Sequence, residues 1–112
     1  MRVLVCGGRD FQDARQMYSW LDGLLPRPTL IIQGGAFGAD AIASEWAYKR
    51  DVLERQFPAD WKKHGRAAGP IRNQQMLEEG KPELVVAFPG GIGTADMVRR
   101  ARAAGVRVLV VK

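Results

Sequence analysis

Short apolar runs alternate along the chain with longer segments of helical character. Four runs rich in Val, Ile and Leu predict strands, and a fifth, more diluted run predicts another. The clear strands are expected at Arg2–Cys6, Thr29–Gln33, Leu84–Phe88 and Val106–Val111, and the diluted one at Val52–Phe57. Helices are expected at about 12–25, 39–50, 70–79 and 94–104. This alternation predicts an α/β fold with a doubly wound, mainly parallel five-stranded sheet flanked by helices.

Details of the pattern place some of these elements. Apolar residues recur at helical spacing from Ala39 to Trp46 and from Thr94 to Ala101, which gives each helix one face for the sheet. The arginines of the last helix fall outside that stripe and predict a solvated cationic face. Arg55 and Gln56 dilute the third strand, so we expect it near the sheet edge. Residues 58–69 are expected to form a long functional loop.

Length and composition limit the function classes. The 112 residues suit one domain, and a single Cys excludes a disulfide framework within the chain. With a single His beside it, a zinc site would need carboxylates for most of its ligands, so a metal-built fold is disfavoured. No apolar run approaches the roughly 18 residues needed to span a bilayer, and MRVLVCGG is too short for a signal peptide. We therefore expect a cytoplasmic domain with no membrane partner and no resident cofactor. The net charge of +5 is spread along the chain, so it favours anions without selecting nucleic acid.

Glycines gather at one kind of position. Eight of the 13 glycines lie in three loops that each follow a predicted strand and precede a predicted helix: Gly7, Gly8, Gly34, Gly35, Gly38, Gly90, Gly91 and Gly93. The carboxyl ends of parallel strands share one edge of the sheet, and ligands bind there where strand order reverses. Glycine lets backbone N–H groups approach a ligand, and a following helix N-terminus attracts anions. The three loops together favour a phosphate site over ordinary tight turns.

Common nucleotide motifs are absent. The loop after the first strand is GGRDF, not G-x-G-x-x-G, and the second strand ends in QGG rather than in an acidic residue. A dinucleotide oxidoreductase is therefore disfavoured. The chain also lacks a P-loop and a G-x-S-x-G element, so nucleotide hydrolysis by a P-loop and an ordinary nucleophilic triad are disfavoured too.

Four ordered motifs resemble a known family: GGRDF at 7–11, QGGAFGADAIASEWA at 33–47, PADWKKHGRAAGPIRNQQM at 58–76 and FPGGIGTADMV at 88–98. Together they resemble the YspA-like (cpYpsA-related) branch of the SLOG superfamily, which also includes the Lonely Guy phosphoribohydrolases and the DNA-processing protein DprA. The resemblance covers nearly the whole chain. It implies a single Rossmann-like domain over residues 1–112 that binds a nucleotide or nucleotide-derived ligand.

The match to the Lonely Guy enzymes is incomplete. Their P-G-G-x-G-T-x-x-E motif is matched by Pro89, Gly90, Gly91, Gly93 and Thr94, but Met97 stands at the Glu position. Asp96 lies about 100° away around the helix and can replace that carboxylate only if the helix start is remodelled. Their Arg-Lys-x-x-Met motif is matched by Arg72 and Met76, with Asn73 in place of Lys. The resemblance therefore supports ligand binding more strongly than N-glycosidic cleavage, with Arg72 and Asp96 as the candidate catalytic residues.

Other candidates have structural alternatives. Arg72 after a Gly-Pro turn suits a bidentate phosphate contact, or is simply exposed. Arg9 can neutralise phosphate, while Asp10 can bind a ribose hydroxyl or cap the helix expected near residue 12. Asp40 either contacts ligand or complements the dipole of its helix.

Two residues of the long loop and two residues beside the glycine loops are further candidates. Trp61 can stack on a base or cover the core, and His64, a lone His without a positioned partner, is more typical of a structural or solvated residue than of an acid or base. Cys6 is expected to be an inert apolar filler. Thr94 can bind phosphate, cap its helix, or do both.

These observations favour a nucleotide-binding or sensing module. The first alternative is a phosphoribohydrolase or related N-glycosidase acting on nucleoside monophosphates, with Asp10, Asp40 or Asp96 as its carboxylate. The second is single-stranded nucleic-acid binding, which requires affinity that falls steeply with salt. A second copy of the chain is a further candidate partner, since a domain this small would bury additional surface in a homodimer.

Overall fold

The computed structural model describes residues 1–112 and contains five strands and five α-helices. The strands are β1 (Arg2–Cys6), β2 (Leu30–Gln33), β3 (Leu53–Gln56), β4 (Leu84–Ala87) and β5 (Arg107–Val110). The helices are α1 (Ala14–Asp22), α2 (Ala39–Lys49), α3 (Trp61–His64), α4 (Ala68–Gly80) and α5 (Ile92–Ala103), with a 3-10 turn, η1 (Gly65–Ala67), before α4. All five predicted strands are confirmed, within about two residues at each end.

The sheet is entirely parallel, in the order β3-β2-β1-β4-β5. Strand order reverses between β1 and β4, so the carboxyl ends of these two strands form the switch point of a Rossmann-like, doubly wound sheet. β3 is an edge strand with all four residues exposed, as its diluted apolar run predicts.

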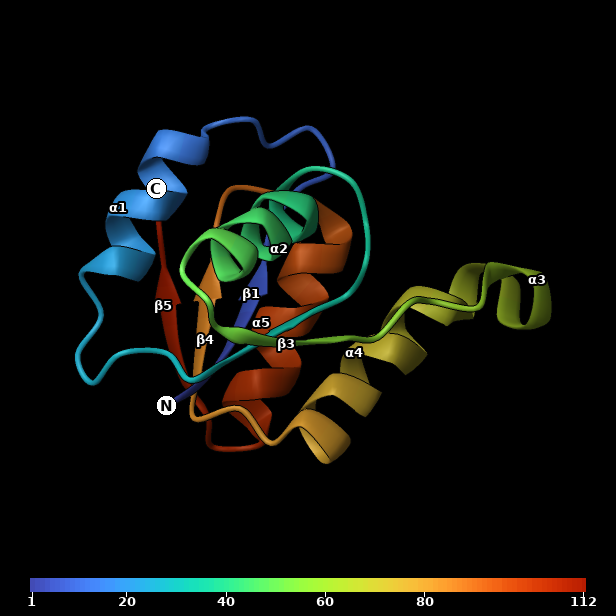
Figure 1. Ribbon diagram of the computed structural model, residues 1–112. Helices are drawn as coiled ribbons and strands as arrows, with labels where there is room; N and C mark the ends of the chain where they lie inside the picture. Colours follow the sequence, from blue (N-terminus) through green and yellow to red (C-terminus); the bar gives the residue numbers. More distant parts are fainter.

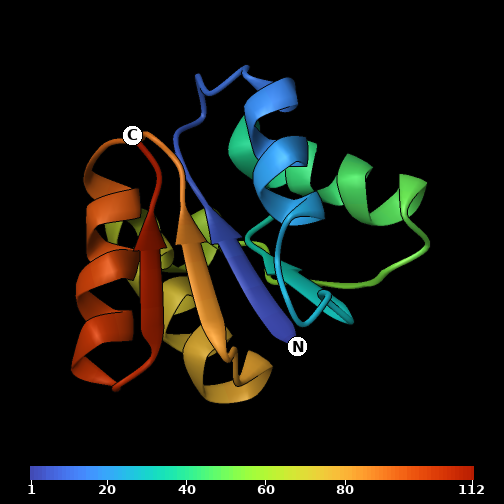
Figure 2. The ribbon, with the colours of Figure 1, turned by 90° about the vertical axis from the view of Figure 1, so that its left-hand side faces the viewer.

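Helices cover both faces of the sheet, with α1 and α2 on one side and α4 and α5 on the other (Figures 1 and 2). Successive residues of β1 point to opposite faces, so Val3 and Val5 enter one apolar cluster while Leu4 and Cys6 enter the other. The first cluster contains 13 buried residues and the second contains 10. This two-sided burial explains why β1 and β4 are almost continuously apolar.

The segment 58–69 differs from the expectation of an open loop. Asp60 caps α3 by accepting a hydrogen bond from the N–H of Lys63, and η1 leads directly into α4. The resulting arm projects from the body of the domain (Figure 1). The start of α4 two residues before Pro70 places Arg72 inside the helix rather than at its beginning.

Two capping alternatives are also wrong. Asp13, not Asp10, caps α1, accepting from the N–H of Gln16 at 3.0 Å. Helix α5 begins at Ile92 with Gly91 as its N-cap, so Thr94 is its third residue.

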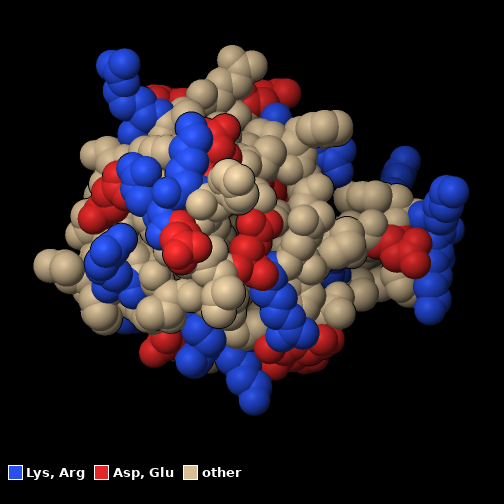
Figure 3. Space-filling model, viewed as in Figure 1, with Lys and Arg blue, Asp and Glu red and all other residues tan.

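Charged side chains are dispersed over the face shown in Figure 3, with a basic group at the tip of the projecting arm. Lys62, Lys63 and Arg66 are exposed in that segment. No helix is both long enough and apolar enough to cross a membrane.

Candidate functional site

The three glycine loops meet at the carboxyl edge of the sheet. The N–H of Gly8 donates to the carbonyl of Pro89 at 2.9 Å, and the N–H of Ala39 donates to the carbonyl of Gly8 at 3.1 Å. A side chain on Gly38, which has a φ of +75°, would overlap the backbone of Gly8 and Arg9. Backbone contacts therefore hold the loops after β1, β2 and β4 together, and these contacts require glycine.

Two neighbouring cavities open at this edge. The switch-point cavity, of about 720 Å³, lies between the β1 and β4 loops and the starts of α4 and α5. The β2–β3 cavity, of about 510 Å³, lies over the ends of β2 and β3 beside α2. Both volumes fall in the range of about 300–1,000 Å³ that is usual for small-molecule sites. The shared wall consists of Arg9, Ala36, Asp40, Trp61 and Arg72.

The N-terminus of α5 faces the switch-point cavity without a side-chain cap. The backbone N–H groups of Ile92, Gly93 and Thr94 find no acceptor within the chain. Free N–H groups and the positive end of the helix dipole attract an anion. By contrast, the side chain of Asp13 satisfies the first turn of α1, which lies away from the cavities.

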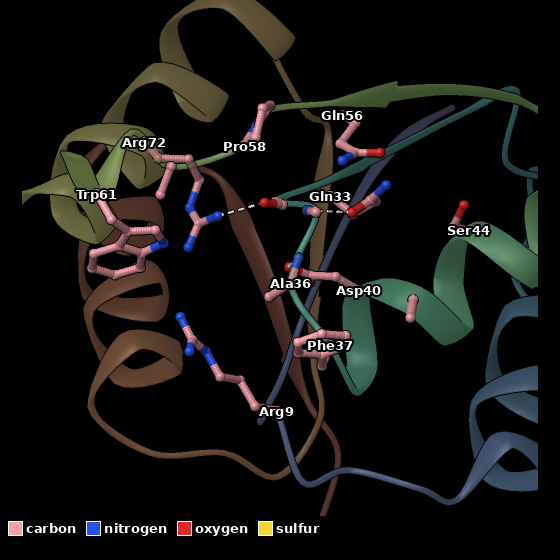
Figure 4. Close-up of a pocket in the computed structure, with 14 residues that line it drawn as sticks. Arg9, Gln33, Ala36, Phe37, Asp40, Ser44, Gln56, Pro58, Trp61 and Arg72 are labelled. Atoms are coloured by element: carbon pink, nitrogen blue, oxygen red, sulfur yellow. Dashed lines mark hydrogen bonds between the residues drawn. The ribbon is translucent and has the colours of Figure 1, made fainter. Parts of the chain in front are cut away.

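Arg72 is held in the shared wall with part of its guanidinium free. Its Nη1 donates to the carbonyl of Gly34 at 2.6 Å (Figure 4). Its Nε donates to Oδ1 of Asn73 at 3.1 Å. Its Nη2 has no hydrogen-bond partner in the chain. Burial lowers the pKa of Arg72, an effect that the nearby Asp40 carboxylate opposes. A fixed, partly buried cation with an unused donor suits an anionic ligand.

Arg9 and Trp61 bring the β1 loop against the projecting arm. The guanidinium carbon of Arg9 lies 5.5 Å from the Trp61 ring centroid, a cation–π contact. Both side chains line both cavities, and Figure 4 shows them at the wall of the β2–β3 cavity. This pair closes the site on the side of α3, where sequence alone predicted only a loop aromatic.

Asp40 is the acidic side chain of the shared wall. It is buried, and its Oδ2 accepts from the N–H of Ala36 at 3.2 Å. Burial raises the pKa of the Asp40 carboxyl above its usual value, although the Ala36 N–H and the charge of Arg72 oppose this effect. The position of Asp40 between the two cavities favours a ligand contact over the purely dipolar role.

Asp96 lines the switch-point cavity but is fully engaged. Its Oδ1 accepts from Arg99, and its Oδ2 accepts from Nδ2 of Asn73 at 3.0 Å and from Nε of Arg100 at 2.9 Å. Burial disfavours its charge, yet the hydrogen bonds from Asn73 and Arg100 outweigh burial, and the pKa of Asp96 lies below its usual value. Arg99 and Arg100 thus hold this carboxylate rather than forming only a solvated face.

Asn73 links α4 to α5. Besides accepting from Arg72 and donating to Asp96, its Nδ2 donates to the carbonyl of Gly93 at 3.2 Å. A lysine at this position has no acceptor to offer to Arg72. Asn73 therefore forms the bridge that orients Arg72.

Cys6 forms part of the cavity floor. Burial, the main cause, raises the pKa of its thiol to about 12, so the thiol stays protonated at neutral pH. This agrees with the expected role as an inert filler.

The site residues expected from the sequence divide between the two cavities and their surroundings. Thirteen line one or both cavities: Gly7, Gly8, Arg9, Gly34, Gly35, Asp40, Trp61, Arg72, Asn73, Gly91, Gly93, Thr94 and Asp96. Asp10, Pro89 and Gly90 line a separate hollow beside the β1 loop, and Gly38 acts through backbone packing. His64 lines neither cavity.

Several lining residues were missed from the sequence. The β2–β3 cavity includes Gln33, Phe37, Ser44 and Gln56, and the switch-point cavity includes Arg66. The positions of Gln33 and Gln56 in the sequence could have indicated them, because both residues end adjacent strands at the edge that carries the glycine loops.

Comparisons with known proteins identify the family of the chain. The model of the YspA, cpYpsA-related SLOG family matches residues 1–64, which include the first two glycine loops and Trp61. The Gene 61 protein of Mycobacterium phage D29 is 36% identical over 118 aligned residues, covering 96% of this chain and 94% of the phage protein. The likeness to the phage protein extends over Arg72 and the third glycine loop as well. The chain therefore belongs to the YspA, cpYpsA-related SLOG family.

Proposed function

We propose that this protein binds a phosphate-bearing nucleotide or ribonucleotide derivative and acts as a binding or sensing module. Membership of the SLOG family supports a role in nucleotide-related binding or processing. The observation that carries the proposal is the pairing of the unused Nη2 of Arg72 with the uncapped N-terminus of α5 at one cavity. Together these groups offer a charged donor and several backbone N–H donors to one phosphate.

The first test is a thermal-shift screen against nucleoside mono- and diphosphates, ADP-ribose, NAD and cyclic nucleotides. A ligand at 100 times its dissociation constant adds about 2.7 kcal/mol to the free energy of unfolding, which raises the midpoint visibly. A shift for at least one phosphate-bearing nucleotide, and none for the matching nucleoside, is expected. If no nucleotide shifts the midpoint, the proposal is wrong.

Removing the guanidinium of Arg72 is expected to weaken binding of the ligand so identified. Arg72→Ala deletes a charged hydrogen bond, and the affinity should fall by about 10- to 100-fold. Arg72→Lys should recover only part of this loss, because an ammonium cannot reproduce the planar guanidinium contact. The measurement is isothermal titration calorimetry, with Arg107→Ala at the opposite edge of the sheet as the control. Equal affinity of Arg72→Ala and wild type would remove Arg72 from the site.

The position of Asp40 supports a second candidate function, hydrolysis of an N-glycosidic bond. A carboxylate in the wall between two cavities stands where a ligand that spans them has its ribose, and such a group can stabilise an oxocarbenium-like transition state. Water would add across the bond to give free base and ribose 5-phosphate in equal amounts. Asp96, held by three donors, is less available for this role.

Chromatography of nucleoside monophosphates after overnight incubation distinguishes hydrolysis from binding. An enzyme releases free base, and Asp40→Asn should reduce that rate by about 100-fold or more. Asp96→Asn is the comparison variant and is expected to reduce the rate less. Intact nucleotide recovered after clear binding supports the sensing module.

A further inference from the structure

The two cavities differ sharply in the charge of the residues that belong to only one of them. The switch-point cavity has Arg66, Arg99 and Asp96 of its own, in addition to the free N–H groups of α5. The β2–β3 cavity has no charged residue of its own, and its polar side chains are Gln33, Ser44 and Gln56. Its only charges are those of the shared wall. A phosphate is therefore better matched by the first cavity and a neutral polar group by the second.

The amide of Gln56 is the free recognition group of the β2–β3 cavity. Gln56 ends the edge strand β3, and its side chain makes no hydrogen bond within the chain. A side chain at Gly35, whose φ is +74°, would overlap the Gln56 amide, so glycine at position 35 leaves room for it. Figure 4 shows this amide on the cavity side of the strand. A primary amide offers both a donor and an acceptor, as the edges of nucleobases do.

A rigid polar network supports the floor beneath this amide. The Nε2 of Gln33 donates to Glu54 at 2.7 Å, and Oε1 of Gln33 accepts from the N–H of Gly35. The hydroxyl of Ser44 also donates to Glu54, at 2.8 Å. These bonds tie α2, β2 and β3 together and use the polar groups of Gln33. Gln56 is thereby left as the amide available to a ligand.

Phe37 supplies an aromatic surface at the rim of the same cavity. Its side chain is 83% exposed, and it follows Ala36 in the loop between β2 and α2. Figure 4 places its ring beside Asp40, on the loop that borders the cavity. Phe37 thus adds an exposed aromatic ring to the cavity that also holds the free amide of Gln56, and every base has a face that can stack on such a ring.

We propose that the β2–β3 cavity is the subsite for the heterocyclic base of the ligand, with Gln56 as the residue that reads the base edge and Phe37 as the residue that stacks on it. The phosphate then lies in the switch-point cavity, and the ribose lies against the shared wall between them. This inference rests on the proposed nucleotide-binding function. It goes further by naming the ligand class as one that carries both a phosphate and a base, and by placing the base.

The test compares ligands that do and do not carry a base. Ribose 5-phosphate and the four common nucleoside 5′-monophosphates are titrated calorimetrically against wild type, Gln56→Leu and Phe37→Ala. Gln75→Leu and Tyr48→Ala serve as matched controls, since Gln75 lies on α4 and Tyr48 on α2 and neither lines a cavity. Circular dichroism of each variant checks that the fold is retained, which is expected because Gln56 and Phe37 are exposed.

Wild type is expected to bind at least one nucleotide about 10-fold or more tightly than ribose 5-phosphate. Gln56→Leu and Phe37→Ala should each remove most of this preference for the nucleotide, while their affinity for ribose 5-phosphate stays within about twofold of wild type. Gln75→Leu and Tyr48→Ala should keep the preference for the nucleotide. A preference that survives in both variants overturns the assignment of the base subsite. If ribose 5-phosphate binds as tightly as every nucleotide, the base subsite is wrong but the phosphate site stands. If none of these probes binds wild type, the proposed function and this inference both fall.

Discussion

Tryptophan in place of Gly91 is expected to abolish nucleotide binding, with a loss of at least about 100-fold in affinity, while the thermal unfolding midpoint stays within about 3 °C of wild type. Gly91 is the N-cap of α5, and its φ of −105° lies outside the left-handed region. A Cβ built on it meets nothing within 4 Å. The new indole would therefore occupy the mouth of the switch-point cavity, in front of the free N–H groups, without disturbing the core.

The control for this variant is Ala104→Trp, which places the same side chain at the other end of α5. The Ala104→Trp protein should bind nucleotide with wild-type affinity. Calorimetric titration gives the affinities, and differential scanning calorimetry gives the midpoints. Wild-type affinity in Gly91→Trp would mean that the phosphate does not bind at the α5 N-terminus. Gly38 and Gly90 are poor sites for this test, because a Cβ on either would collide with the β1 loop.

The fold can be predicted from the sequence more completely than the details of the site can. Apolar runs as clear as those of β1 and β4 arise because both faces of a central strand are covered, and the diluted run of β3 marks an edge strand. The grouping of glycine loops on one edge followed from the parallel order of the strands. These features depend on local pattern and on topology, which sequence periodicity reports well.

The parts of the site that the sequence did not predict depend on contacts between distant segments. Arg99 and Arg100 lie one helical turn after Asp96, so helical spacing alone allows both pairs. The burial of Asp96 against Asn73 of α4, in contrast, depends on how two helices pack. The arm at 61–67 is helical because Asp60 caps it, although its composition is that of a loop. The sequence pattern marks Gln56 only as a polar residue that weakens a strand, because its place in the cavity depends on the absence of a side chain at Gly35.

The second large effect concerns stability. Trp46→Ala is expected to reduce the free energy of unfolding by about 3–5 kcal/mol, a large share of the roughly 5–15 kcal/mol typical of a small domain. Trp46 is 1% exposed in the apolar cluster beneath α1 and α2, and its Nε1 donates to Oδ1 of Asp22 at 2.9 Å. Alanine would leave a large cavity there. Urea denaturation gives the measurement, with Trp20→Ala, at 41% exposed on α1, as the control that should cost much less.

Trp46→Phe separates the ring from its hydrogen bond. Phenylalanine retains most of the buried apolar area, and Asp22 keeps its two bonds to Arg50, so the expected cost is nearer to 1 kcal/mol. Equal costs for Trp46→Ala and Trp20→Ala would contradict the packing of α2 described above. Because Trp46 lies nearly two helical turns from Asp40, the folded fraction of Trp46→Ala should bind nucleotide with wild-type affinity. Loss of stability without loss of intrinsic affinity would show that the core of α2 and the ligand site at its N-terminus are energetically separate.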